Sequence, residues 1–185
     1  MSRIPTPADI ASAPEASHKL LEGVRASIGS VPNLFRLIGT SPAALEGYLG
    51  LNGALAKGAL DAATRERIAL AVANVNGCDY CNAAHTYIGK NIAKLDDGEL
   101  AANREGRSDD PRAHVAVQFA RKVAVDRGAV TETDIASVKA AGYSDAEIVE
   151  IVAHVALNTL TNYMNEVFKT DVDFPAVAPA ARIAA

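Results

Sequence analysis

The chain has 185 residues, long enough for one compact domain, with 49% apolar residues, 22% charged residues and a formal net charge of -4. An acidic chain without a run of basic residues is not expected to bind nucleic acid. The N-terminal residues lack the apolar stretch of a secretory signal, and no apolar run approaches the roughly 20 residues of a membrane span. We therefore expect a cytoplasmic protein that contacts no membrane.

Hydrophobic periodicity predicts helices between two non-helical ends. Residues 1–13, rich in Pro, Ser and Ala, are expected to form an extended N-terminal arm, and residues 173–185 an extended or disordered C-terminal tail. No segment alternates with a period of two for long enough to require a strand. The sequence predicts an all-α fold in a single domain spanning residues 1–185. The expected helices cover residues 15–28, 34–38, 42–57, 61 or 64 to 75, 78–94, 112–127, 132–141 and 145–169.

Some segments carry further signals. From Ile68 to Val75 the chain is apolar nearly all round, which predicts a buried helix, and Asn76-Gly77 is a turn signal. Residues 96–111 are polar and contain Gly, Asp and Pro, so we expect a mobile surface segment there. Residues 63–90 match residues 144–171 weakly, which indicates either a degenerate internal repeat or a chance likeness of two apolar helices.

Both cysteines of the chain lie in one short motif that ends in a histidine. Cys78 and Cys81 are three residues apart, and His85 follows one helical turn later on the same face. The preceding Asn-Gly pair puts Cys78 at or near a helix N-terminus, where free N–H groups and the helix dipole favour a thiolate. The imidazole can accept the thiol proton, so the spacing predicts a dithiol redox site.

Glu66 is the candidate partner for His85. On one unbroken helix it would lie about 18 Å from Cys78, too far to touch either residue. If the chain reverses at the Asn-Gly turn, the two helices pack side by side and the carboxylate can orient the imidazole, as the third member of a catalytic triad does. Tyr80, between the cysteines, is a candidate for either substrate binding or packing.

These residues resemble the AhpD-like (carboxymuconolactone decarboxylase-like) alkylhydroperoxidases. The family pattern is Glu, eleven residues, Cys-x-x-Cys, three residues and His, and Glu66, Cys78, Cys81 and His85 match it without a gap. Segments 31–35, 41–43, 158–159 and 161–163 resemble its peroxidase-related branch. The resemblance covers roughly residues 15–175, and it implies a helical bundle that forms a homo-oligomer, commonly a trimer or hexamer.

The resemblance also implies a mechanism. Cys81 would be the peroxidatic thiol, deprotonated by His85 in relay with Glu66, and Cys78 would resolve the resulting sulfenic acid as a disulfide. An external dithiol of the lipoyl or thioredoxin type would reduce that disulfide, and no bound cofactor is needed. The best-known family member has a histidine between its cysteines, where this chain has Tyr80.

Other interpretations of the motif stay open. The cysteines could serve a general thiol-disulfide oxidoreductase that never meets peroxide, or pack as small apolar groups. Together with His85 and Glu66 they could also bind zinc in an oligomeric structural module, although zinc sites usually draw a second ligand pair from a distant segment. We expect no metal. His154, on an apolar helix face, is predicted to be a core or interface histidine.

Overall fold

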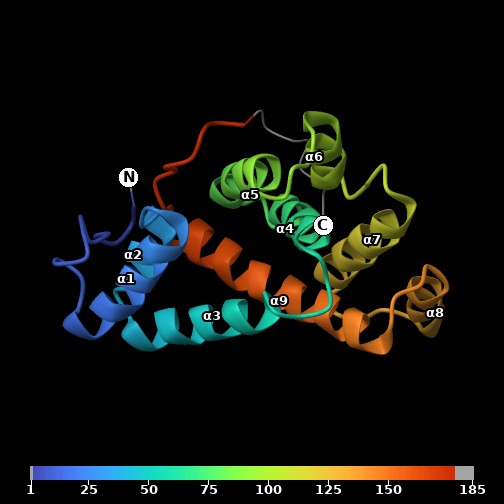
Figure 1. Ribbon diagram of the computed structural model, residues 1–185, viewed down its shortest axis with the longest axis horizontal. Coiled ribbons are helices and arrows are strands. Elements are labelled where there is room, and N and C mark those ends of the chain that lie inside the picture. Colours follow the sequence, from blue (N-terminus) through green and yellow to red (C-terminus); the bar gives the residue numbers. More distant parts are fainter. Residues whose placement is uncertain (1, 178–185) are drawn as a thin grey trace.

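The computed structural model describes residues 2–177 and confirms an all-α fold in that part of the chain (Figure 1). The longest helix, α9, runs across the molecule and contacts most of the others. The helices are α1 (Glu15–Ile28), α2 (Asn33–Ile38), α3 (Pro42–Leu55), α4 (Ala62–Val75), α5 (Asp79–Asn91), α6 (Asp97–Arg104), α7 (Pro111–Val125), α8 (Glu132–Ala140) and α9 (Asp145–Phe168).

Short-range capping explains where most of these helices begin. A side chain just before the helix accepts a hydrogen bond from a free backbone N–H of the first turn, which satisfies a donor that the helix itself leaves unpaired. The capping residues are Ser41, Asp61, Cys78, Asp96, Asp110, Thr131 and Ser144 for α3 to α9 in turn. All of these signals lie within a few residues of the helix that they begin.

Helix α4 is the centre of the fold. It packs against α5, α6, α7 and α9, and its side chains from Ile68 to Ala73 are all buried, as the apolar run predicts. One apolar cluster joins α4 to α7, α8 and α9, and a second lies between α1, α2, α3 and the start of α5, around the cysteines. The site residues therefore sit between two parts of the core.

The loop between α3 and α4 is held by a carboxylate from α9. Glu150 accepts hydrogen bonds from the backbone N–H groups of Ala59 at 2.9 Å and Leu60 at 3.0 Å. Gly58 leaves room for this contact, because a Cβ there would lie 2.5 Å from an Oε2 atom of Glu150. The contact positions the first turns of α4, which carry Glu66.

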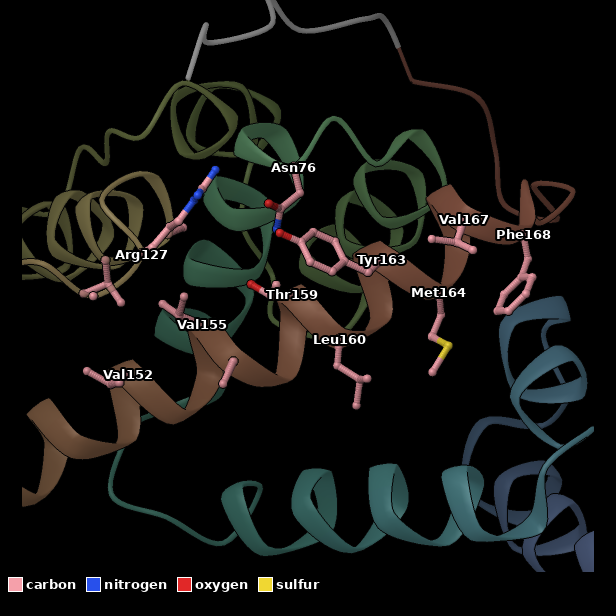
Figure 2. A pocket seen from close by; sticks show the side chains of 14 residues that line it. Asn76, Arg127, Val152, Val155, Thr159, Leu160, Tyr163, Met164, Val167 and Phe168 are labelled. Carbon is pink, nitrogen blue, oxygen red and sulfur yellow. The ribbon is translucent and has the colours of Figure 1, made fainter.

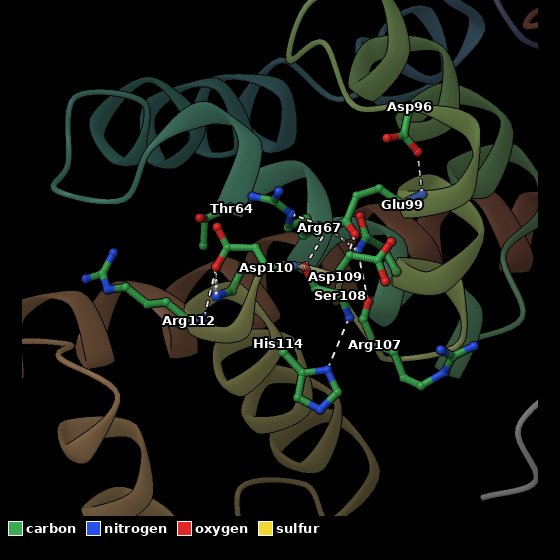
Figure 3. A network of polar contacts seen from close by, with 12 residues as sticks. Thr64, Arg67, Asp96, Glu99, Arg107, Ser108, Asp109, Asp110, Arg112 and His114 are labelled. Carbon is green, nitrogen blue, oxygen red and sulfur yellow. Dashed lines mark hydrogen bonds and ion pairs between the residues drawn. The ribbon is translucent and has the colours of Figure 1, made fainter.

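The expectation of a mobile segment at residues 96–111 is wrong. Residues 97–104 form α6, and Glu99 is only 5% exposed within a polar network (Figure 3). Its carboxylate accepts from Arg67 Nε at 2.6 Å, Ser108 Oγ at 2.5 Å and the Asp109 backbone N–H at 2.8 Å. Burial alone raises the pKa of Glu99, but these hydrogen bonds and that from Asn103 outweigh it and lower the pKa to about 2.

The two segments of the expected repeat have different structures. Residues 63–90 form two helices, α4 and α5, separated by a turn, whereas α9 runs without a break through most of residues 144–171. The turn has a local cause, since Gly77 adopts φ of 66°, a left-handed conformation that favours glycine. The reversal of the chain is thus specific to the segment that carries the cysteines.

Both ends of the described chain pack on the helices. The backbone N–H of Arg3 donates to the carbonyl of Phe168 at 2.7 Å, so the N-terminal arm is attached to the end of α9. Residues 173–177 are non-helical, and Phe174 stacks edge-on against Tyr80 with 5.7 Å between ring centroids. The remainder of the expected C-terminal tail lies outside the described residues. Within residues 2–177, no helix is both long and apolar enough to cross a bilayer.

Candidate active site

The turn at Asn76 and Gly77 folds α5 back beside α4. The backbone N–H of Cys78 donates to the carbonyl of Ala73 at 2.9 Å, which closes the turn. The Asn76 side chain donates to Oδ1 of Asn162 on α9 at 2.8 Å, so the turn is also attached to the long helix. One continuous helix would have kept Glu66 away from the motif, and this reversal brings it close.

Glu66 and His85 form the pair that the turn predicts. Oε2 of Glu66 lies 2.8 Å from Nδ1 of His85. The neighbouring arginines bind elsewhere, since Arg67 pairs with Glu99 and Arg65 donates to the backbone carbonyls of residues 56 and 60. Burial alone lowers the pKa of His85, but the charge of Glu66 and its hydrogen bond outweigh burial and raise it. The predicted geometry is confirmed.

The two cysteines are free thiols in unequal environments. Cys78 is 0% exposed and caps α5 by accepting from the backbone N–H of Cys81 at 3.2 Å. Its hydrogen bond to the Cys81 sulfur, followed by burial, raises the pKa of Cys78 far above the ordinary range. The helix N-terminus therefore does not favour a thiolate at Cys78, contrary to the sequence prediction, because donation to Cys81 and loss of solvent outweigh the helix end.

Cys81 carries the lower pKa of the pair. Cys81 is 2% exposed, and burial alone raises the pKa of its thiol. The hydrogen bond from Cys78, the charge of His85 and a hydrogen bond from Asn165 outweigh burial and lower the pKa to about 7. The thiolate of Cys81 is therefore more populated at pH 7 than that of an ordinary thiol. Cys81 is the better nucleophile at neutral pH.

Helix α9 supplies a site residue that sequence reasoning did not find. Nδ2 of Asn165 donates to Sγ of Cys81 at 3.2 Å. The sequence does contain a signal for it, because α9 carries polar side chains at helical spacing on a face that is otherwise apolar. These side chains are all buried: Asn158, Thr161, Asn162 and Asn165. A stripe of buried amides needs partners, and the thiol is one of them.

Tyr80 serves packing and also lines the site cavity. Its hydroxyl accepts from the Leu34 backbone N–H at 3.2 Å and donates to Asp173 at 2.8 Å. The residue thus ties α5 to α2 and to the C-terminal segment. Its side chain also borders the cavity beside Cys81, so it can contact a bound molecule.

A cavity of about 190 Å³ opens beside these residues. Cys81, His85 and Glu66 line it from α4 and α5, Tyr48 from α3, and polar residues of α9 complete the wall. Burial, then the charges of Cys81 and Glu66, raise the pKa of Tyr48, so its hydroxyl stays protonated and able to donate a hydrogen bond. The arrangement combines an ionisable thiol, a neighbouring thiol, a base and its carboxylate around a small space.

A larger groove of about 690 Å³ lies on the opposite face of α9 (Figure 2). The figure shows Val152, Leu160, Tyr163 and Val167 along one side of the helix, and all four are exposed. Its lining is mostly apolar, and it contains none of Glu66, Cys78, Cys81 or His85.

The geometry does not favour the zinc interpretation of the motif. Among residues 2–177, no three His, Cys, Asp or Glu side chains gather as a set that could hold a metal ion. Glu66 is instead paired with His85, and the two sulfurs accept hydrogen bonds from the Cys81 backbone and from Asn165.

Comparison with known proteins agrees with the fold. The carboxymuconolactone decarboxylase family profile matches residues 42–122, and no curated protein sequence matches significantly. The alkylhydroperoxidase AhpD core, an uncharacterized peroxidase-related protein from Ralstonia eutropha JMP134, is 26% identical, with TM-score 0.83 over 93% of this chain and 92% of that chain. A peroxidase-related protein from Silicibacter sp. TM1040 is 22% identical, with TM-score 0.80 over 92% and 91%.

The same fold also occurs in a protein with a different activity. The debrominase Bmp8 in complex with 2,3,4-tribromopyrrole is 19% identical, with TM-score 0.77 over 94% of each chain. At this identity the likeness concerns the fold alone, so the chemistry has to be argued from the residues of the site.

Proposed function

Because the chain belongs to the AhpD-like, carboxymuconolactone decarboxylase-like family, we propose that it is a cofactor-free dithiol peroxidase that reduces hydroperoxides through Cys78 and Cys81. The observation that carries the proposal is the low pKa of Cys81 next to a second thiol and the His85–Glu66 pair. An attacking thiol is most effective when its pKa is near the ambient pH, and Cys81 meets that condition at neutral pH.

The reaction has two steps on the protein. In the first, the Cys81 thiolate attacks one oxygen of the hydroperoxide, so that an S–O bond forms and the O–O bond breaks. The leaving alkoxide takes a proton from the imidazolium of His85, and an alcohol departs from Cys81 sulfenic acid. Glu66 keeps the imidazole oriented and stabilises its protonated form.

In the second step Cys78 attacks the sulfenic sulfur. An S–S bond forms, the S–O bond breaks, and the Cys78 proton leaves with the hydroxyl group as water. The backbone N–H of Cys81 donates to the Cys78 sulfur at 3.2 Å, and this contact supports the step because it holds the resolving thiol beside its target. An external dithiol, of the lipoyl or thioredoxin type, then reduces the disulfide by thiol exchange and returns both cysteines to the reduced form.

The test uses the two cysteine variants with a stoichiometric organic hydroperoxide. Cys81→Ser should consume no peroxide, whereas Cys78→Ser should accumulate a sulfenic acid on residue 81 that a dimedone-type reagent traps. If Cys78→Ser abolishes the first oxidation instead, the two roles are reversed. If the wild-type thiols resist peroxide but exchange with disulfide substrates, the protein is a general thiol-disulfide oxidoreductase.

We also propose that the protein works as a homo-oligomer, a trimer or hexamer, in the reducing cytoplasm. The exposed apolar face of α9 in Figure 2 supports assembly, because large contiguous apolar patches on soluble proteins usually mark interaction surfaces. A second copy of the chain is the expected occupant, and light scattering after size exclusion measures the stoichiometry. Tyr163→Glu, at the centre of this face, should shift the mass towards the monomer.

A further inference from the structure

His154 is a buried titratable residue of the cavity that the proposed mechanism leaves unused. It is only 5% exposed and lines the same cavity as Cys81, Glu66 and His85. Its Nε2 atom is fully buried and has no hydrogen-bond partner among residues 2–177. Leaving such an atom unpaired is unfavourable, and buried polar atoms in proteins nearly always have a partner, so this atom calls for one. The adjoining cavity is where a partner can enter.

The position of His154 on α9 places it at the other end of the cavity from the reactive sulfur. Residues 154, 158, 161 and 165 follow at steps of four, three and four, so they share one face of the helix. Asn165, at one end of this row, donates to the Cys81 sulfur. His154 lies about 16 Å from Asn165 along the helix axis, at about 1.5 Å per residue. The cavity therefore has a thiol end and an imidazole end.

The charges around His154 indicate what kind of group it binds. Burial, followed by the charge of Arg65, lowers the pKa of His154, while the carboxylates of Glu150 and Glu66 act in the opposite direction with less effect. The imidazole is therefore neutral at pH 7, with one cation and two carboxylates nearby. Such surroundings select neither an anion nor a cation. An uncharged oxygen, a hydroxyl or a carbonyl, is the matching partner.

The cavity volume limits the size of the molecule. At about 190 Å³ it is smaller than the roughly 300–1,000 Å³ of sites for drug-sized ligands, and equals the volume of about six liquid waters. Hydrogen peroxide is too short to contact both ends, and a long lipid chain does not fit within this volume. A short carbon chain fits this volume, whose lining includes both Cys81 and His154.

From these observations we propose that His154 is a specificity-determining residue, and that the preferred substrate is a short-chain organic hydroperoxide with an uncharged hydroxyl or carbonyl at the end remote from the peroxide. The peroxide group reacts at Cys81 while Nε2 of His154 hydrogen-bonds the remote oxygen. This inference rests on the proposed peroxidase function, and it adds the substrate class. His154 positions the substrate and takes no part in the redox step.

The experiment compares two hydroperoxides that differ only at the remote end: n-hexyl hydroperoxide and its analogue with a terminal hydroxyl. The rate of Cys81 oxidation is measured under subsaturating conditions for the wild type, His154→Phe and His154→Gln. One neutral hydrogen bond corresponds to about a two- to tenfold preference for the hydroxylated compound. We expect that preference in the wild type, a loss of it in His154→Phe, and partial retention in His154→Gln, whose amide can still form a hydrogen bond.

Alkylation of Cys81 by iodoacetamide provides the control, because it reports thiolate reactivity without using the remote subsite. Equal alkylation rates in the three proteins, with preference lost only in His154→Phe, support the inference. Equal oxidation rates for the two hydroperoxides in the wild type, or an unchanged preference in His154→Phe, overturn it and leave the peroxidase function standing. If neither compound oxidises Cys81 in the wild type, the proposed function is refuted as well.

Discussion

Replacing Asn165 with alanine removes the amide that donates to the Cys81 sulfur at 3.2 Å. A hydrogen bond to a charged group contributes about 1.5–3 kcal/mol, and one pKa unit corresponds to about 1.4 kcal/mol. Taking the lower limit for a sulfur acceptor, we expect the pKa of Cys81 to rise from about 7 to about 8. The thiolate fraction at pH 7 then falls from about a half to about a tenth.

The rate of Cys81 alkylation by iodoacetamide, followed by mass spectrometry across pH, measures this change. At pH 7 the variant should react about fivefold more slowly than the wild type, and the two rates should converge at alkaline pH, where both thiols are ionised. The apparent pKa belongs to the coupled pair of thiols, so the comparison is between proteins and not with an isolated cysteine.

Asn158→Ala is the matched control. Asn158 is a buried amide on the same face of α9, but its Nδ2 donates to the His154 carbonyl at 2.8 Å instead of to sulfur. Its removal should leave the alkylation profile unchanged. An unshifted profile in Asn165→Ala, or an equal shift in both variants, would refute the assignment of the low pKa to this hydrogen bond.

Other predictions concern the base, acid stability and a loop. Glu66→Gln should lower the pKa of His85, because its charged partner is lost; NMR titration of the ring protons tests this, and an unmoved pKa would contradict the pairing. Glu99 has a pKa of about 2 in the fold against 4.5 ordinarily, so it stabilises the fold by about 3 kcal/mol above pH 4.5, and this stability is lost as pH falls towards 2. The free energy of unfolding, measured with urea, should therefore fall more steeply with decreasing pH in the wild type than in Glu99→Gln. Parallel curves for the two proteins would argue against a stabilising role of the Glu99 charge. Gly58→Ala should destabilise by about 1–3 kcal/mol, because its Cβ displaces the carboxylate that holds the α3–α4 loop. Gly50 lies in α3 with open space around the position of a Cβ, so Gly50→Ala should instead stabilise the fold by about 0.5–1 kcal/mol in thermal unfolding. A stability change of the same sign in Gly58→Ala and Gly50→Ala would count against the steric reasoning.

The helices could be predicted because their signals are local. Ser41, Asp61 and Ser144 cap the helices that follow them. The turn needs a left-handed backbone conformation at position 77, and the glycine there adopts it readily. The Glu66–His85 contact followed from that turn, since reversing the chain there leaves α4 and α5 side by side. Local hydrogen bonds and the helical period were enough for this part of the site.

The segment at residues 96–111 shows where local reasoning fails. Its composition is polar, which is typical of mobile loops, yet Glu99 collects donors from α4 and from the loop after α6. A polar side chain becomes structural when distant donors surround it, and composition carries no information about those donors.

The sequence by itself determined the all-helical fold and the four residues of the motif, because helices and motif spacings depend on neighbours a few positions apart. Only the tertiary structure set the two thiols apart, since a hydrogen bond to Cys81 and burial raise the pKa of Cys78 while Asn165, from a helix 84 residues away, helps to lower that of Cys81. The tertiary structure also placed His154 in the wall of the cavity that Cys81 and His85 line. A pKa depends on solvent exclusion and on charges in space, and neither is written in the order of residues along the chain.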